Sequence, residues 1–289
     1  MNAEESLSAA KQITVGDFRI TCVRAGTYWW DGGAFFGVVP RTLWSKRHPP
    51  DDLNRVEAAF NCYIIQTGRQ TILLDTGGGD KFDDRYYERA RMARPLQPLT
   101  EAIAAAGIDP ERIDTVVNSH LHWDHCGWNT VRRGDAWEPS FPGATYVTQR
   151  AEWEHAHERY VRDAVSYIDA NYDPLVDSGR MQLIEGDRDL VPGIRLVRAP
   201  GHNRDMMCVL AQTAGETFAF LADLAPTATH VTPTWVAAFD LYPVQSIEQK
   251  LEWIPRAARE GWVCGFSHEM DLPFARISET NGKFAAALP

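Results

Sequence analysis

The stretch NSHLHWDHCGW, residues 118–128, places three histidines and one aspartate within six positions of a chain that has nine histidines in all. His120 and His122 are two residues apart, so in an extended segment their side chains point to the same side and can converge on one ion. Asp124 and His125 follow as the chain begins to turn, where they can face a second ion. Because imidazole and carboxylate groups suit zinc, the stretch predicts a metal site.

The segments that precede this motif predict an α/β fold. Residues 60–79 have the pattern of two strands around a turn, and the second strand ends at Asp75 in a glycine cluster. Residues 98–109 have a helical pattern, and residues 113–120 form a short apolar strand that leads into the motif. Strand, helix and strand in this order are typical of α/β sheets, which place their sites at the ends of strands.

The rest of the chain continues this alternation. We expect strands over 144–149, within 183–202, and over 217–224 and 262–268, and helices over 150–171 and 246–261. The later helix begins at Ser246 in a capping box, and 262–268 is the last strand. Potential metal ligands stand at or just after four strand ends: His120, His202, Asp223 and His268. Because no linker interrupts the chain, we expect a single domain over 1–289, with a helical insertion at about 150–171.

Composition excludes several classes of protein. The 289 residues are 44% hydrophobic and 24% charged, as in ordinary soluble enzymes. A net charge of −10 offers no basic face to nucleic acid or to an anionic membrane. No stretch approaches the roughly 20 apolar residues of a membrane span, and the N-terminus lacks the apolar core of a signal peptide. Five widely spaced cysteines indicate reduced thiols, so we expect a cytoplasmic protein.

Five elements occur in an order that is typical of one family. They are Asp75 in DTGGG, the HxHxDH motif, His202 in APGHN, Asp223 in LADL and His268 in FSHE. With these elements the chain resembles the metallo-β-lactamase-fold hydrolases over nearly its whole length. The resemblance implies an α/β fold of four layers, an αββα sandwich, with the metal site at the ends of strands.

The resemblance also implies a ligand set and two divalent metal ions. His120, His122 and His202 would hold one metal, Asp124, His125 and His268 the other, and Asp223 would bridge them. Zinc is the first expectation, and Mn, Fe or Co are alternatives. With two such metals, a bridging hydroxide would exist near neutral pH. The metal charge that the carboxylates and the hydroxide do not neutralise would polarise a carbonyl or phosphoryl oxygen. Asp124 would pass a proton to the leaving group, and Asp75 would orient the ligand loop through hydrogen bonds.

An aromatic stretch over residues 26–44 has two explanations. It packs on the core or on a second copy in a homodimer, or it overhangs the metal site and binds an acyl or aryl group. In the second case the substrate contacts are Tyr28, Trp29, Phe35 and Phe36, and His230 is a further candidate. His155 and His157 are expected on the surface of a helix.

The expected function is hydrolysis of a small, largely apolar lactone or ester at a dinuclear site. The chain resembles the lactonase and organophosphate-hydrolase branches of the family. Residues 224–230, LAPTATH, lack the tyrosine that lactonases carry after the bridging aspartate. A phosphotriesterase that uses the same hydroxide on phosphorus is the alternative, and a metal-binding scaffold without catalysis is a third. The expected partner is a small-molecule substrate, with no nucleic acid and no membrane.

Overall fold

A computed structural model describes residues 10–92 and 97–289. The chain divides into two compact units. The first takes the chain up to Thr27 together with Phe60–Glu185, and the second takes Tyr28–Ala59 together with Gly186–Pro289. The expectation of a single domain stays a prediction.

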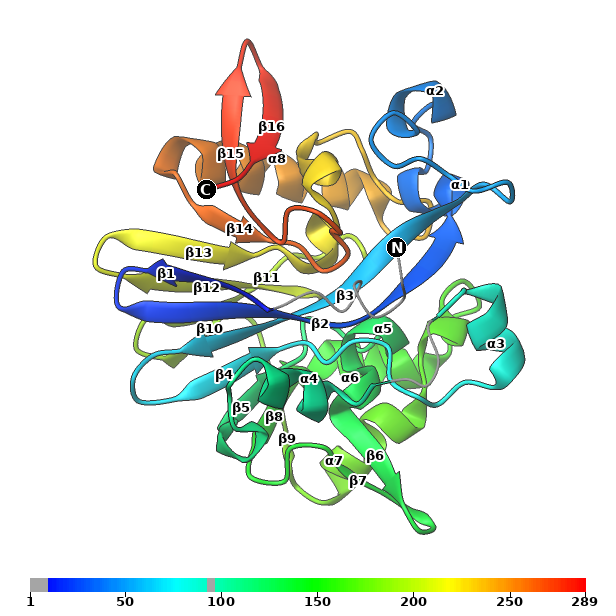
Figure 1. Ribbon diagram of the computed structural model, residues 1–289, viewed down its shortest axis with the longest axis vertical. Helices are drawn as coiled ribbons and strands as arrows, with labels where there is room; N and C mark the ends of the chain where they lie inside the picture. Colours follow the sequence, from blue (N-terminus) through cyan, green and yellow to red (C-terminus); the bar gives the residue numbers. More distant parts are fainter. Residues whose placement is uncertain (1–9, 93–96) are drawn as a thin grey trace. The chain divides into compact units, whose positions relative to one another are not determined.

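A seven-stranded sheet forms most of the first unit, in the order β1-β2-β3-β4-β5-β8-β9 (Figure 1). β1 pairs antiparallel with β2, and β3 with β4, whereas β4, β5, β8 and β9 run parallel. The strands are β1 Lys11–Val15, β2 Phe18–Asp31, β3 Arg55–Gln66, β4 Thr71–Leu74, β5 Thr115–Val117, β8 Thr145–Gln149 and β9 Met181–Ile184. A separate hairpin consists of β6 Thr130–Arg133 and β7 Ala136–Pro139.

Helices of the first unit pack on this sheet through one hydrophobic cluster. Leu99 and Ile103 of α4 join Ile64, Leu73 and Val116 of the strands in that cluster. The helices are α3 Asp84–Arg89, α4 Leu99–Ala105, α5 Trp123–Cys126, α6 Arg150–Glu158 and α7 Asp173–Asp177, with 3₁₀ turns η1 Pro110–Arg112, η2 Gly127–Asn129, η3 Ala164–Ser166 and η4 Asp169–Asn171. The cluster supports the parallel strands from which the motif emerges.

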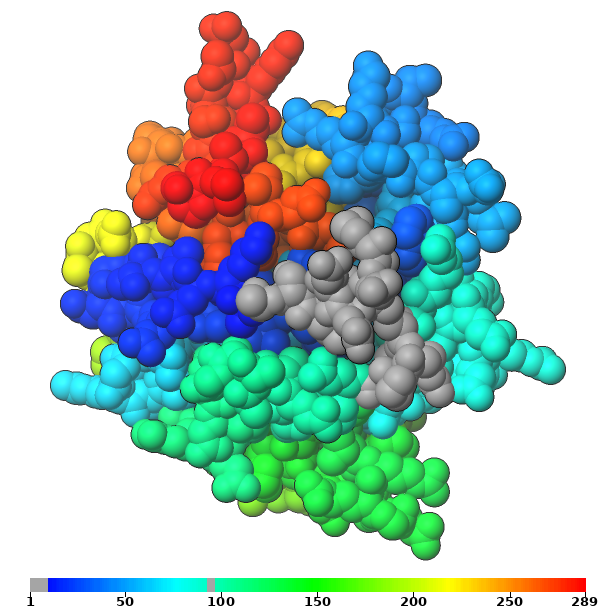
Figure 2. Space-filling view, in the orientation of Figure 1, coloured from blue at the N-terminus to red at the C-terminus, as the bar shows by residue number. Residues whose placement is uncertain are grey.

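The second unit is built on another seven-stranded sheet, in the order β10 to β16. All neighbours in it are antiparallel except β13 and β14. The strands are β10 Arg188–Val191, β11 Ile194–Arg198, β12 Met207–Thr213, β13 Glu216–Phe220, β14 Val263–Gly265, β15 Phe274–Thr280 and β16 Lys283–Ala287. The β15–β16 hairpin, red in Figures 1 and 2, protrudes from the rest of this unit.

The long helix of the second unit connects β13 to β14. It is α8 Pro243–Glu260, and it packs on β15 and β16. A proline at its start and Gly261 in the left-handed conformation at its end, with φ 67°, are typical helix boundaries. The shorter helices are α1 Gly32–Phe36, α2 Arg41–Trp44, η5 Ala222–Leu224 and η6 Ala228–Val231.

The mixed α/β class is confirmed, and several element boundaries differ from the prediction. The expected helix over 150–171 ends at Glu158, because Arg159 is left-handed with φ 51°, and only 3₁₀ turns follow. Ser246 lies inside α8 and does not cap it. The strand over 262–268 is not the last, since β15 and β16 follow.

Two expectations from composition can be compared with the structure. All five cysteines are free thiols and buried, as expected. None of the helices in the described ranges has the length and apolar character that a membrane span requires.

Candidate metal centre

The motif loop, residues 118–128, begins where β5 ends and contains α5. Since β5 ends at Val117, His120 lies in the loop and not on the extended strand that the sequence predicts. Two amide hydrogen bonds brace the loop against the turn that follows it. Asn118 Nδ2 donates to Asn129 Oδ1 over 3.1 Å, and Asn129 Nδ2 donates to Asn118 Oδ1 over 2.9 Å. These bonds tie the first residue of the loop to the residue that follows it.

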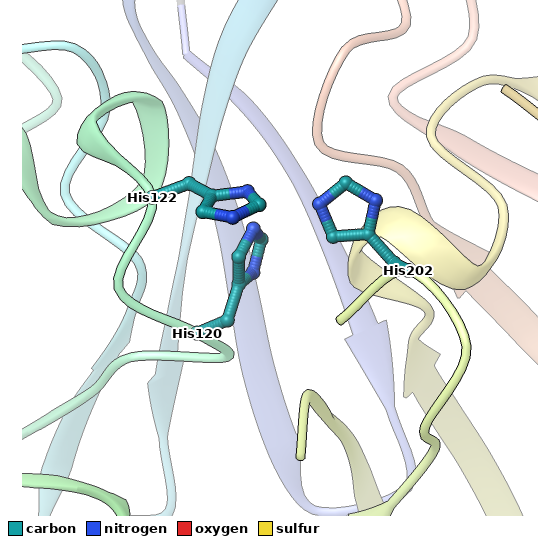
Figure 3. Close-up of side chains that lie close together, drawn as sticks. All are labelled: His120, His122 and His202. Atoms are coloured by element: carbon teal, nitrogen blue, oxygen red, sulfur yellow. The ribbon is translucent and has the colours of Figure 1, made fainter. Parts of the chain in front are cut away.

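Three histidine rings of the motif loop lie together in the interior of the first unit. The ring centroid of His120 lies 4.6 Å from that of His122 and 4.0 Å from that of His125. All three residues are buried. Figure 3 shows the rings of His120 and His122 projecting side by side from the loop. Burying ring nitrogens is favourable only where they meet hydrogen-bonding groups or a metal, so this arrangement fits metal binding.

Asp75 holds the motif loop through both of its carboxylate oxygens. Its Oδ1 accepts the backbone N–H of Ser119 over 2.7 Å, and its Oδ2 accepts the Ser119 hydroxyl over 2.8 Å. The same Oδ2 lies 2.8 Å from Nδ1 of His125. Asp75 itself has φ 56°, a conformation that few non-glycine residues adopt. These contacts suit the orienting role that the sequence suggests for Asp75.

Asp124 and an aromatic cluster flank the histidines. Asp124 Oδ2 lies 3.9 Å from Nε2 of His125, and the carboxylate is partly exposed. Next to Asp124 in sequence, Trp123 makes edge contacts with Phe82 and Tyr86 at centroid distances of 4.9 and 5.6 Å. The residue pattern did not indicate this cluster, because Phe82 and Tyr86 precede the motif by about 40 positions.

In the second unit, the carboxylate of Asp223 lies between two histidines. Asp223 follows β13 in the turn η5, so it stands just beyond the strand on which the sequence places it. Its Oδ2 lies 3.5 Å from Nε2 of His202, and its Oδ1 lies 3.3 Å from Nε2 of His268. His202, also drawn in Figure 3, comes from the turn after β11. Asp223 thus faces one histidine with each of its two oxygens.

Asp240 is a residue that sequence reasoning missed. Its Oδ1 lies 3.0 Å from Nδ1 of His202, and its Oδ2 accepts the Ser246 hydroxyl over 2.6 Å. Gly201 permits the close approach of this turn to α8, because a Cβ there would lie 2.5 Å from Ser246 Oγ. Ser246 therefore serves the site and not the helix cap that the sequence predicts.

His268 is fixed by the N-terminal part of the second unit. Its Nδ1 lies 2.9 Å from the carbonyl oxygen of Ala59 and 3.3 Å from the hydroxyl of Tyr28. The ring of Phe35 lies 6.1 Å away, edge-on. Tyr28 and Phe35, two of the predicted substrate contacts, thus pack against a predicted metal ligand.

The other predicted substrate contacts have different surroundings. Phe36 is fully buried and stacks on His230 at 5.1 Å and on Trp44 at 5.0 Å. His230 is also fully buried, and its Nε2 lies 3.0 Å from the carbonyl oxygen of Phe35. Burial lowers the pKa of His230 well below its usual value. This environment favours the packing explanation for Phe36 and His230, whereas Trp29 is half-buried.

The two histidines of α6 differ from each other. His157 is exposed, as expected, but His155 is buried and its Nε2 lies 2.8 Å from Asp163 Oδ2. The expectation of a surface position for His155 is therefore wrong. His157 lies near Asp169 and Asp173 in a surface group. The Asp169 carboxylate already pairs with Arg159 there. This group of surface residues is therefore a poor candidate for a metal site.

The donor chemistry fits a divalent metal. The chain has five predicted ligand histidines. In four of them Nδ1 contacts a group outside the ligand set, which orients the ring and leaves Nε2 for a metal. These contacts join His120 to Ser119 Oγ at 3.0 Å, His125 to Asp75, His202 to Asp240, and His268 to Ala59. Imidazole nitrogens with aspartate oxygens suit Zn and equally Mn, Fe or Co.

Comparison with known proteins places this donor set in a family. The model of the Metallo-beta-lactamase superfamily matches residues 59–268. The chain belongs to this superfamily. Its fold is therefore the one expected, and histidine and aspartate groups that could hold metal ions are present in the described part of the chain.

The relatives are lactonases and other hydrolases. An N-acyl homoserine lactonase from Bacillus sp is 28% identical over 163 residues, which cover 53% of this chain and 58% of that relative. The chain thus matches little more than half the length of that lactonase. N-acyl homoserine lactonase AiiB from Agrobacterium fabrum is 26% identical over 263 residues, which cover 86% of this chain and 92% of the relative.

Solved structures resemble the chain over almost its full length. A probable metal-dependent hydrolase from Staphylococcus aureus has a TM-score of 0.88 at 28% identity and covers 96% of this chain and 99% of its own. The hydrolase AbOPH has a TM-score of 0.81 at 20% identity, with 97% of each chain covered. AidC, a dizinc quorum-quenching lactonase, has a TM-score of 0.79 at 18% identity, with 98% of each chain covered. The last two likenesses concern the fold alone.

Proposed function

We propose that this protein is a metal-dependent hydrolase with two divalent ions, zinc in the first instance, that cleaves a small, largely apolar lactone or ester. The observation that carries the proposal is the placement of Asp223, whose two oxygens face Nε2 of His202 and Nε2 of His268. A carboxylate so placed could join two metals, and metals bound there would lower the pKa of water enough to supply a nucleophile without a strong base.

The proposed ligand set provides for two metals. One metal would be held by His120, His122 and His202, the other by Asp124, His125 and His268, and Asp223 would be the bridge. Metals held there would supply hydroxide near neutral pH and polarise the carbonyl of the substrate. Asp75 and Asp240 would orient the rings of the ligand histidines. The partly exposed Asp124 would pass a proton to the leaving group.

The choice of a lactone or ester rests on two kinds of support. The curated relatives are N-acyl homoserine lactonases, and their substrates carry a lactone and an acyl chain. Trp123, Phe82 and Tyr86 form an aromatic cluster beside Asp124, which suits an apolar group. Tyr28 and Phe35 pack on His268, so they would contact a substrate that is bound at the second metal. Phe36 and His230 are kept only as support for Phe35, because both are fully buried.

A phosphotriesterase is the second candidate, since the same hydroxide can attack phosphorus. It has only the fold of AbOPH in its favour, so we rank it below the lactonase. A scaffold that binds metal without catalysis is the third. Cytoplasmic location and a homodimer stay predictions.

The test measures turnover and metal content together. Purified protein loaded with zinc is offered acyl-homoserine lactones, aryl esters and a phosphotriester, beside Asp223→Asn and the control Asp189→Asn, whose carboxylate is 75% exposed. We expect lactone or ester hydrolysis that falls at least about 100-fold in Asp223→Asn and is unchanged in the control. Phosphotriester turnover alone would favour the second candidate. Two bound zincs with no turnover on any substrate would favour the scaffold.

A further inference from the structure

Three buried ionisable side chains lie close to the motif loop in the first unit and belong to no ligand set. They are Glu152, His155 and Asp163, with relative exposures of 0%, 2% and 4%. Two stand on α6 and the third in the segment after it. Burying charged groups is costly unless they are paired, so each position requires a partner that accounts for it.

Glu152 contacts the backbone between two predicted ligands. Its Oε1 accepts the N–H of Leu121 over 2.9 Å and the hydroxyl of Tyr167 over 3.1 Å. Leu121 separates His120 from His122, so this hydrogen bond fixes the peptide that sets the relative orientation of their rings. The ring of Tyr167 also lies 4.9 Å from that of His122.

Asp163 faces the next ligand in the loop. Its Oδ2 lies 2.8 Å from Nε2 of His155 and 4.0 Å from Nε2 of His122. His155 thus anchors the carboxylate, and the carboxylate stands opposite the outer edge of the His122 ring. For the other four histidines an outer group meets Nδ1, whereas for His122 the buried carboxylate of Asp163 lies on the Nε2 side of the ring. With Asp163 on its Nε2 side, the ring of His122 would offer Nδ1 to a metal.

We propose that Glu152 and Asp163 are positioning residues that raise the metal affinity of the motif loop. Glu152 holds the backbone between His120 and His122, and Asp163, anchored by His155, holds the ring of His122. The inference rests on the proposed function, since it presupposes a metal on these histidines. It assigns the segment after β8 a role in metal retention, which packing of α6 on the sheet alone would not require.

The experiment measures zinc affinity of the full-length protein, by competition with a chromophoric chelator after removal of metal. The variants are Glu152→Leu, Glu152→Gln and Asp163→Asn. The control is His157→Gln on the exposed side of the same helix. We expect zinc affinity to fall by about 10–100-fold in Glu152→Leu and Asp163→Asn. Glu152→Gln keeps an oxygen for Leu121 N–H and should recover most of the affinity. The control should match the wild type.

A second readout separates positioning from stability. The visible spectrum of the cobalt-loaded protein reports ligand geometry, and we expect it to change in Asp163→Asn while the melting temperature of the metal-free protein stays unchanged. Wild-type zinc affinity in folded Asp163→Asn and Glu152→Leu overturns the inference and leaves the proposed function standing. If Glu152→Leu does not fold, Asp163→Asn decides alone. A wild-type protein that binds no zinc overturns the inference and the proposed function together.

Discussion

Nδ1 of His202 lies 3.0 Å from Oδ1 of Asp240, a carboxylate 38 residues further along the chain. Replacing Asp240 with alanine removes the acceptor that orients this ring and that receives the Ser246 hydroxyl. We expect zinc affinity and kcat/KM each to fall by about 10–100-fold. We also expect the free energy of unfolding to fall by about 1–3 kcal/mol, because two buried groups lose their acceptor.

Zinc titration and urea unfolding of the same samples check this prediction. The exposed Asp189→Ala serves as the control, since it removes a surface carboxylate of the second unit that is no predicted ligand. A loss of stability with unchanged zinc affinity would mean that Asp240 only supports the turn.

The contrast between Asp75 and Asp240 explains what the sequence could predict. Asp75 stands in the glycine-rich turn DTGGG directly after a strand, and this turn precedes the HxHxDH motif in the order typical of the family. Its role could therefore be suggested from the residues. Asp240 lies in an unremarkable turn, and only the tertiary fold brings it to His202. The carboxylates of Glu152 and Asp163 were missed for a similar reason, because a polar helical segment has the same composition whether its charged side chains meet water or a loop.

The sequence also predicted the ends of several strands inaccurately. His120, Asp223 and His268 were expected at the ends of strands, yet each lies in a loop or turn three residues beyond β5, β13 or β14. An apolar run continues past the last ladder pair, because a buried turn needs apolar residues as much as a strand does. The hairpin β15–β16 was missed, because most of its residues are exposed and leave no continuous buried apolar run in the sequence.

Substitution of Gly127 by alanine should destabilise the first unit. A Cβ at Gly127 would lie 2.2 Å from the carbonyl carbon of Gly78 and 2.4 Å from the nitrogen of Gly79, so two backbone segments would have to separate. We expect a loss of about 3 kcal/mol in the free energy of unfolding. Gly143→Ala is the matched control, because its nearest atom beyond neighbouring residues would lie at 3.5 Å. Equal melting temperatures for the two variants would contradict this account of the glycine cluster.

Phe36→Ala distinguishes packing from substrate binding in the aromatic stretch. Its ring is fully buried between His230 and Trp44, so we expect a loss of about 3–5 kcal/mol in stability. Val38→Ala, at a side chain that is 93% exposed, should change nothing. Thermal unfolding and KM for a lactone are measured for both. A raised KM at wild-type stability would restore Phe36 as a substrate contact.

The stability of the protein should rise above pH 8 because of Lys81. Burial lowers the pKa of this ammonium to about 8, while it donates to the carbonyl oxygens of Gly127 and Thr130 over 2.7 Å each. The unfolded chain keeps its proton up to the ordinary value of 10.5, so between these pH values it binds more protons than the folded protein. Stability therefore increases with pH in that window, by at most about 3 kcal/mol.

Urea unfolding between pH 7 and pH 10 compares the wild type with Lys81→Met. The difference in unfolding free energy between the two proteins should change with pH in the wild type's favour. A constant difference would mean that the two carbonyl oxygens stabilise the ammonium as well as water does.

His268→Ala tests the number of metals directly. The backbone of His268 is fixed independently of its ring, since its N–H donates to the carbonyl of Pro226 over 2.9 Å and its carbonyl accepts from Ala59 over 3.2 Å. The variant should therefore fold and lose one ligand of the proposed second metal. Elemental analysis should find close to two metals per wild-type chain and about one in the variant. One metal per chain, unchanged by the substitution, would mean that His268 is no ligand and would contradict the dinuclear proposal.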